Sequence, residues 1–206
     1  MLLRIKKLSK MILPIIGYGN PVLKRKAEKI SDKYPNLNNL IKDMWETMYN
    51  AKGVGLAAPQ VGFSIRLFIV DTSPFSDDET MDDGEIEMIN SFKKVMINPI
   101  IIQESGKEWD FNEGCLSIPD LRADIRRSEK IIIKYYDEYF NLFEESYEGI
   151  IARVIQHEYD HIEGILFTDK LSPLKRKLLK GKLKNISAGK IETDYEMKFI
   201  KPLKNR

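Results

Sequence analysis

Both histidines of this 206-residue chain lie within five residues of each other, in the sequence HEYDH at positions 157–161. A spacing of four places His157 and His161 one turn apart on the same side of a helix. Two imidazoles so placed can bind one metal ion, and Cys115, the single cysteine, is a candidate third ligand that leaves a fourth position open. The pattern therefore predicts a helix over about residues 148–163, closed by Gly164, on which the chain builds a metal site.

A helical wheel over this stretch, at about 100° per residue, assigns each side chain an environment. His157 and His161 fall on the rim of an apolar stripe, and Glu158 falls in its middle. A buried carboxylate is costly unless something nearby uses it, so Glu158 is a candidate general acid/base. Burial raises the pKa of such a carboxyl, and a nearby cation lowers it. The predicted solvent-exposed face carries Arg153, Gln156, Asp160 and Glu163.

The third metal ligand decides the class of enzyme. Zinc endopeptidases of the HExxH type take a third ligand downstream, but this chain has no third histidine, and Glu192 and Glu196 lie in a polar tail. Cys115 is the better candidate because a thiolate binds borderline and soft divalent ions strongly. Taken alone, the residues leave open an endopeptidase, an inert buried cysteine beside a surface helix, or a non-catalytic protein that binds metal or RNA.

The periodicity of apolar residues predicts an α+β fold of short, mostly antiparallel strands packed around the central HExxH helix, with an N-terminal and a C-terminal helix. The N-terminal helix covers 35–52 and is ended by Gly53; the C-terminal helix begins at Ser172-Pro173. The segment 53–60 is too rich in Gly and Pro for a regular element. Extended segments are predicted at 63–71, 94–102 with a bulge or sheet edge at Pro99, 109–117, 130–136 and 142–147.

The length and charge pattern predict a single catalytic domain over 1–206. Its expected appendages are an N-terminal extension at 1–10, an acidic surface loop at 74–92 and a C-terminal tail at 189–206. One cysteine cannot form an internal disulfide, no apolar run approaches the roughly 18 residues of a membrane span, and the N-terminus lacks a signal-peptide cleavage pattern. We therefore expect a cytoplasmic protein without a membrane partner.

Three motifs resemble those of the peptide deformylases and occur in the same order. They are GVGLAAPQ at 53–60, EGCLS at 113–117 and QHEYDH at 156–161. The segments ILPIIGYGNPVL at 12–23 and LFTDKLSP at 166–173 are also similar to that family, so the resemblance covers about residues 11–175. It implies that Cys115, His157 and His161 hold one divalent metal ion, natively Fe2+ in many members, with Zn2+, Ni2+ or Co2+ as substitutes.

The resemblance also implies an activity and the residues that perform it. The expected reaction is hydrolysis of the N-formyl group from the initiator formyl-methionine of nascent polypeptides, releasing formate. Glu158 would be the general acid/base, while the Gln60 amide and the Leu116 backbone N–H would stabilise the oxyanion. The substrate-binding positions that match the family are Val54, Gly55, Ile150 and Val154, and Arg153 also matches a position near the substrate.

Two expectations about partners follow from the C-terminal part of the chain. Residues 170–190 contain eight basic residues and no acidic ones, and this basic helix resembles the ribosome-contacting helix of the family. Bases there could meet ribosomal RNA phosphates, although a solvated helix face explains them equally well. We expect a monomer that acts on formyl-methionyl nascent peptides.

Overall fold

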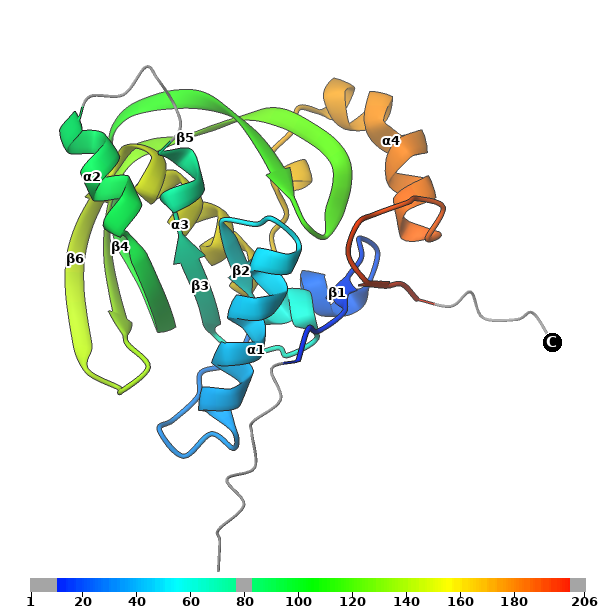
Figure 1. Cartoon of the computed structure of the whole chain (residues 1–206). Coiled ribbons are helices and arrows are strands. Elements are labelled where there is room, and N and C mark those ends of the chain that lie inside the picture. Colours follow the sequence, from blue (N-terminus) through cyan, green and yellow to red (C-terminus); the bar gives the residue numbers. More distant parts are fainter. Residues whose placement is uncertain (1–10, 77–82, 201–206) are drawn as a thin grey trace, which may run out of the picture.

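The computed structural model describes residues 11–76 and 83–200, which form an α+β fold with a mostly antiparallel sheet, as the sequence predicts (Figure 1). Five strands pair in the order β2-β3-β4-β5-β6, all antiparallel, and β1 pairs with β7 in a separate parallel sheet. The predicted extension at 1–10 lies outside the described residues. The elements are β1 Ile15–Ile16, α1 Leu37–Asn50, β2 Gly55–Ala57, β3 Leu67–Asp71, α2 Asp83–Ser91, β4 Lys93–Cys115, β5 Ile118–Tyr136, β6 Leu142–Glu148, α3 Gly149–Ile162, α4 Pro173–Ser187 and β7 Met197–Lys198.

The expectation of short strands is wrong for β4 and β5, which form one long curved hairpin (Figure 1). The polar residues 103–108 separate two predicted extended segments, but they continue β4 through register shifts at Ile97/Ile100, Ile101/Gln103 and Ser105/Glu108. The first of these shifts contains Pro99, which confirms the predicted bulge. Such bulges bend a strand without ending it, so the hairpin carries its tip, residues 115–118, back toward α3.

Helices α1 and α3 bury opposite faces of the short strands. The side chains of β3 alternate, so that Phe68 packs in the same cluster as α3, while Ile69 packs in the same cluster as α1. Helix α1 ends earlier than predicted: Lys52, rather than Gly53, takes the left-handed conformation (φ 54°) after the last turn. The segment 53–60 is also more regular than expected, since it contains β2 and a 3-10 turn at Ala58–Val61.

Helix α3 has no exposed face of the kind that the helical wheel predicts. Arg153 and Gln156 are 2% and 3% exposed, and Asp160 is also buried. Strand β5 covers this side, because the Gln156 side-chain amide donates to the Ser128 carbonyl and Asp160 accepts from Arg127. The polar side chains are therefore paired inside the protein rather than hydrated, a contact that helical periodicity alone does not reveal.

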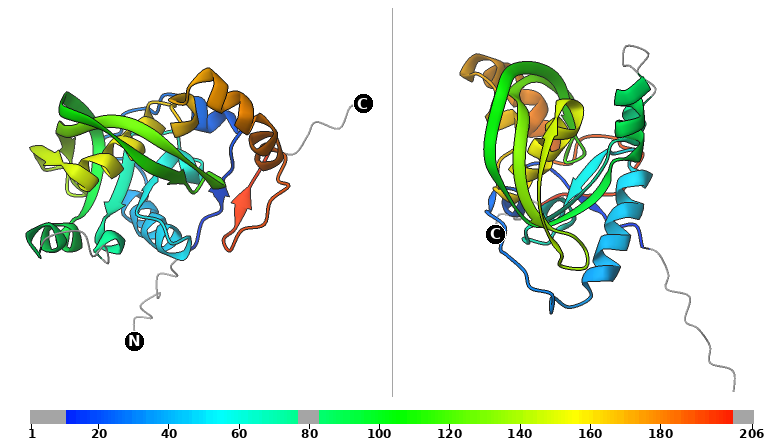
Figure 2. Two further views of the ribbon diagram at one scale, coloured as in Figure 1. Left: turned by 90° about the horizontal axis from the view of Figure 1, so that it is seen from above. Right: turned by 90° about the vertical axis from the view of Figure 1, so that its left-hand side faces the viewer.

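Two segments predicted to be loop or tail have regular structure. The acidic segment 74–92 contains α2, whose Ile89 is buried in the α3 cluster, while residues 77–82 lie outside the described residues. The C-terminal tail contains β7, and β7, α4 and β1 lie at one end of the molecule (Figure 2). Helix α4 begins as predicted, with the Ser172 hydroxyl accepting from the Lys175 N–H. No helix in the described part of the chain is long and apolar enough to cross a membrane.

Candidate active site

The cysteine and the two histidines, distant in sequence, meet where the β4–β5 hairpin tip touches α3. Cys115 is the last residue of β4, directly before the turn made by Leu116 and Ser117. One ligating atom from each of Cys115, His157 and His161 lies within 4.8 Å of the other two. The Cys115 Sγ lies 3.3 Å from His161 Nε2. One thiol and two imidazoles facing a common point match the three-ligand set of a catalytic metal site.

The hydrogen bonding of the two histidines fits a bound cation. His157 Nδ1 lies 2.9 Å from Glu113 Oε2, which leaves Nε2 as the ligating atom, and carboxylate–histidine pairs of this kind commonly orient metal ligands. Burial lowers the pKa of His161 well below its usual value and keeps the ring neutral, as a ligand must be. Burial also opposes the charge on His157, but Cys115 and Glu113 outweigh it and raise its pKa to about 10. The surroundings of Cys115, His157 and His161 therefore favour a single positive charge, which a bound cation would supply.

Glu113 connects His157 to the buried residues Arg127 and Arg153, a role that the sequence did not predict. Its carboxylate receives a two-pronged hydrogen bond from Arg127, at 2.7 and 3.0 Å, a third bond from Arg153 and a fourth from His157. Burial raises the pKa of Glu113, but the bonds from His157 and Arg127 outweigh it and hold the pKa far below its usual range. A permanently ionised Glu113 can therefore hold the His157 ring in one orientation.

Arg127 and Arg153 are buried because each has several acceptors. Arg127 donates to Asp160 at 2.6 Å as well as to Glu113. Arg153 donates to the carbonyls of Ile125 and Trp109, and its guanidinium lies over the Trp109 ring at 4.3 Å. Arg153 thus binds Glu113 and also lines the cleft. A helical wheel, which describes one helix alone, could not reveal these two contacts.

Glu158 is buried on α3, with Oε2 lacking any hydrogen-bond partner among the described residues. Burial raises its pKa to about 7, while the neighbouring His157 opposes the rise. A carboxyl whose pKa lies near neutrality can both accept and donate a proton, which is what general acid/base catalysis requires. The carboxylate has room because residue 55 is glycine: a Cβ at Gly55 would lie 2.5 Å from Glu158 Oε1.

We therefore expect Gly55→Ala to lower turnover about 10- to 100-fold, because displacement of a reacting group by about 1 Å has effects of that size. Steady-state assays on the variant would measure it. Gly181→Ala is the matched control, because a Cβ at Gly181 in α4 meets nothing within 4 Å. It should leave turnover unchanged and raise the free energy of unfolding by about 1 kcal/mol through helix propensity. Equal turnover in the two variants would contradict the assigned contact.

Gln60 and Leu116 both lie next to Cys115. The backbone N–H of Ala57 donates to Gln60 Oε1 at 2.8 Å, so the amide nitrogen is turned toward the hairpin tip. Gln60 Nε2 lies 3.6 Å from Cys115 Sγ and 3.4 Å from Ser117 Oγ. Leu116 follows Cys115 in the turn, outside the paired ladder. Two N–H groups beside a metal site can stabilise an oxygen that becomes negative during a reaction.

These groups open into a cleft of about 610 Å³. Three of the four predicted substrate-binding residues, Val54, Gly55 and Val154, line this cleft. The fourth, Ile150, lies one turn earlier in α3, packs in the core and does not line the cleft. The sequence did not suggest Phe75 and Phe111, which pack edge to face in its wall, or the segment 192–195. Phe75 and Phe111 come from different parts of the chain, so no local sequence pattern predicts their contact. Glu113, in contrast, is the first residue of the EGCLS motif and could have been identified from the sequence.

Known proteins are similar to this chain in sequence and in fold. A family model described as polypeptide deformylase matches residues 12–177. The chain is 59% identical over 196 residues to a peptide deformylase of Christiangramia forsetii, covering 95% of this chain and 100% of that protein. A crystal structure of a peptide deformylase from Legionella pneumophila aligns with a TM-score of 0.70 and 38% identity, covering 84% of this chain and 94% of that one. A crystal structure of peptide deformylase from Thermus thermophilus aligns with a TM-score of 0.73 and 38% identity, covering 85% of this chain and 98% of that one.

Proposed function

The chain belongs to the peptide deformylase family, and from that premise we propose that it is a metal-dependent hydrolase that removes the formyl group from the formyl-methionine of nascent polypeptides. The observation that carries the proposal is the convergence of three metal-ligand side chains with an unpartnered buried carboxyl in one cleft.

Cys115, His157 and His161 would hold the metal ion, and Fe2+ is the proposed native metal, with Zn2+, Ni2+ or Co2+ as substitutes. The mixture of a soft thiolate with two imidazoles suits this group of divalent ions. When bound, such an ion supplies a Lewis acid that polarises the formyl carbonyl and makes water more acidic. Glu113 would keep the His157 ring oriented toward the ion through the Nδ1 hydrogen bond.

Glu158 would move the proton. In its ionised form the carboxylate accepts a proton from the attacking water, and in its protonated form it delivers that proton to the departing amine nitrogen. Its burial supports this role, because a carboxyl shielded from bulk water exchanges its proton with groups in the cleft. Gly55 keeps the space beside Oε1 free.

Gln60 and Leu116 would stabilise the negative charge on the formyl oxygen, through the side-chain amide and the backbone N–H respectively. The bond from Ala57 holds the Gln60 amide in the required orientation before substrate arrives. Val54, Gly55 and Val154 would surround the methionine side chain and its backbone. Ile150 would act only indirectly, by supporting Val154 one turn away on α3.

The remaining features belong to the same proposal. The described elements would form a single catalytic domain organised around α3, which contributes two metal ligands and the proton carrier. The enzyme would work as a monomer in the cytoplasm, where a free thiol stays reduced. The exposed bases of α4 would offer a contact to ribosomal RNA phosphates.

A zinc endopeptidase of the HExxH type is not favoured. Such enzymes take their third ligand downstream of the motif, whereas Cys115 upstream completes the donor set here. The endopeptidase alternative would require Glu192 or another later residue at the metal, and Glu192 instead lies exposed at the cleft rim. The agreement with the deformylase family also weighs against a non-catalytic binding protein.

The test is release of formate from formyl-Met-Ala peptides by protein purified without oxygen and loaded with Fe2+ or Ni2+. We expect turnover that depends on the metal and is absent with acetyl-Met-Ala, because a larger acyl group would crowd the site. The control is cleavage of casein, which should not occur. Absence of formate with every metal, or casein cleavage without formate, would contradict the proposal.

A further inference from the structure

The turn that carries Leu116 has little support from the sheet behind it. Leu116 and Ser117 make this turn at the tip of the β4–β5 hairpin, and the residues on either side of them, Cys115 and Ile118, form a pair. A register shift between Gly114 and Cys115 interrupts the ladder directly behind that pair. The position of Leu116 therefore depends on contacts from outside the hairpin.

The second residue of the turn, Ser117, is held by contacts from two sides. The Tyr18 N–H, in the segment that follows β1, donates to the Ser117 carbonyl at 2.8 Å. The Ser117 hydroxyl oxygen lies 3.4 Å from Gln60 Nε2, and the whole residue is buried. These contacts act on the second half of the turn and not on Leu116.

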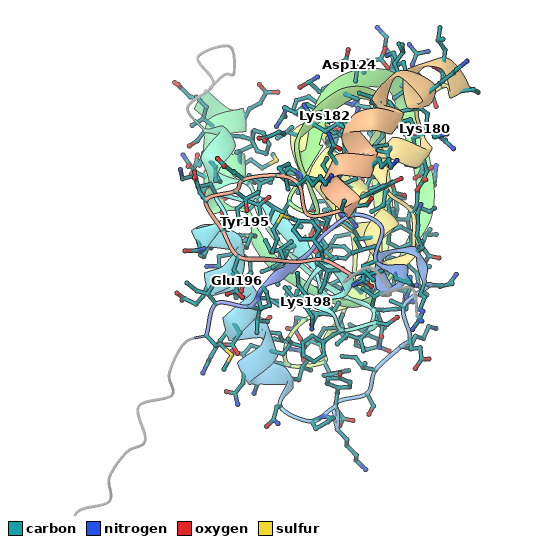
Figure 3. All side chains as sticks on the ribbon, turned by 90° about the vertical axis from the view of Figure 1, so that its right-hand side faces the viewer. Asp124, Lys180, Lys182, Tyr195, Glu196 and Lys198 are labelled. Carbon is teal, nitrogen blue, oxygen red and sulfur yellow. The ribbon has the colours of Figure 1, made fainter. Side chains whose placement is uncertain are left out.

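The first residue of the turn, Leu116, is held by Tyr195 from the C-terminal segment 189–200. The Tyr195 hydroxyl donates to the carbonyl oxygen of Leu116 at 2.8 Å. Tyr195 is half-buried, and Figure 3 shows it on the C-terminal segment. It lies beyond residues 12–177, which match the family model. A residue outside the matched region therefore contacts the turn of the candidate active site.

The segment that carries Tyr195 is fixed to the fold by β1. Directly after Tyr195, the Glu196 carbonyl accepts a hydrogen bond from the Ile15 N–H at 2.8 Å. The Lys198 carbonyl accepts one from the Gly17 N–H at 3.0 Å, which joins β7 to β1. Because the residue after Gly17 holds the second half of the turn, both halves of the turn are bound to one unit formed by β1 and β7.

The bond to the Leu116 carbonyl also limits the direction of the Leu116 N–H. Peptide units are planar, so only the two backbone dihedral angles of Leu116 relate its N–H to its carbonyl. On the other side of this N–H, the Cys115 Sγ lies 3.3 Å from His161 Nε2 in the candidate metal site. The Leu116 N–H therefore lies between two fixed points, the Cys115 side chain and the carbonyl bound by Tyr195.

We propose that Tyr195 is a positioning residue, which holds the Leu116 N–H in the direction that stabilises the formyl oxygen as it becomes negative. The inference rests on the proposed function, because it takes the Leu116 N–H to be an oxyanion donor. A donor that is oriented before the reaction lowers the barrier without reorganisation during it. Tyr195 acts through Leu116, so its hydroxyl contributes to turnover rather than to the binding of metal or substrate.

The test is Tyr195→Phe, which removes the hydroxyl and keeps the ring. The kcat of the metal-loaded enzyme for formyl-Met-Ala should fall about 10-fold, less than the roughly 100- to 1,000-fold lost with an entire oxyanion donor. KM and metal content should stay close to the wild-type values, because the oxygen is negative only in the transition state. Hydrogen exchange in the fragment that contains residues 115–118, measured by mass spectrometry, should become about 5-fold faster through the loss of one hydrogen bond.

Tyr147→Phe is the matched control. Tyr147 is also a half-buried tyrosine whose hydroxyl donates a hydrogen bond, in this case to Glu145, but it does not line the cleft. This variant should have a lower Tm because it too loses a hydrogen bond. Its kcat, its KM and its exchange at residues 115–118 should remain at the wild-type values.

A wild-type kcat in Tyr195→Phe would overturn the inference, while formate release by the wild-type enzyme would still support the proposed function. A raised KM with an unchanged kcat would also overturn it, since Tyr195 would then contact the substrate itself. So would a loss of metal or unchanged exchange at residues 115–118. Absence of formate from the wild-type enzyme would overturn the proposed function and the positioning role together.

Discussion

Replacement of Glu158 by glutamine should lower kcat for formyl-Met peptides by about 1,000-fold, within the range that general acid/base groups contribute. Glutamine has nearly the same shape, but its amide neither accepts the proton from water nor delivers one to the amine. The side chain is buried and has an unpartnered oxygen, so a neutral amide should fit without loss of stability. Formate release and the metal content of the purified protein are the measurements, and the metal content should remain at the wild-type value.

Glu163→Gln is the matched control for this substitution, because Glu163 caps the same helix outside the cleft and pairs with Arg66 and Lys26. It should reduce the free energy of unfolding by about 1–3 kcal/mol, because the buried Arg66 loses its charged partner, but leave kcat within twofold, since it changes no group in the cleft. A Glu158→Gln enzyme with more than about a tenth of wild-type turnover would contradict the proton-transfer role. A variant that has lost its metal would assign Glu158 to metal binding instead.

Local patterns predicted the parts of this protein that depend on neighbours in sequence. The 3–4 spacing of apolar residues gave α1 and α3 nearly at their observed bounds, and Ser172-Pro173 marked the start of α4. The i, i+4 spacing also placed His157 and His161 together, because one helix carries both. These features need no knowledge of which distant segments come into contact.

The rest depends on pairing between distant segments. The approach of Cys115 to α3 results from the bend of the long β4–β5 hairpin. The chemistry of the single thiol suggested Cys115 as a ligand, but no local pattern predicted the bend that brings it to α3. The helical wheel wrongly predicted that Arg153 and Gln156 are exposed to solvent, because it describes one helix without the strand that covers it. The polar segment after Ala188 gave no periodic signal, although Phe199 and Tyr195 fix it to the fold through contacts with residues far earlier in the chain.

Glu113→Gln should be the substitution with the largest effect on stability. It removes the negative charge that compensates Arg127 and Arg153, and all three side chains are 5% exposed or less. Loss of one partner from a buried ion pair lowers the free energy of unfolding by about 3–5 kcal/mol, since the remaining charges stay buried. For a chain of this size that is a decrease in Tm of roughly 10 °C, measurable by calorimetry.

The same variant should bind metal about 10- to 100-fold more weakly, because the amide is a poorer partner for the His157 Nδ1–H than the carboxylate. Asp110→Asn is the matched control: Asp110 also receives a fork of hydrogen bonds from an arginine, Arg126, across the same two strands, but this pair is exposed. Because solvent screens this exposed pair, its loss should leave both the stability and the metal affinity close to the wild-type values. Equal destabilisation by the two variants would mean that burial does not set the strength of the Glu113 network. A wild-type metal affinity in Glu113→Gln would mean that the His157 ring is oriented by the surrounding packing rather than by Glu113.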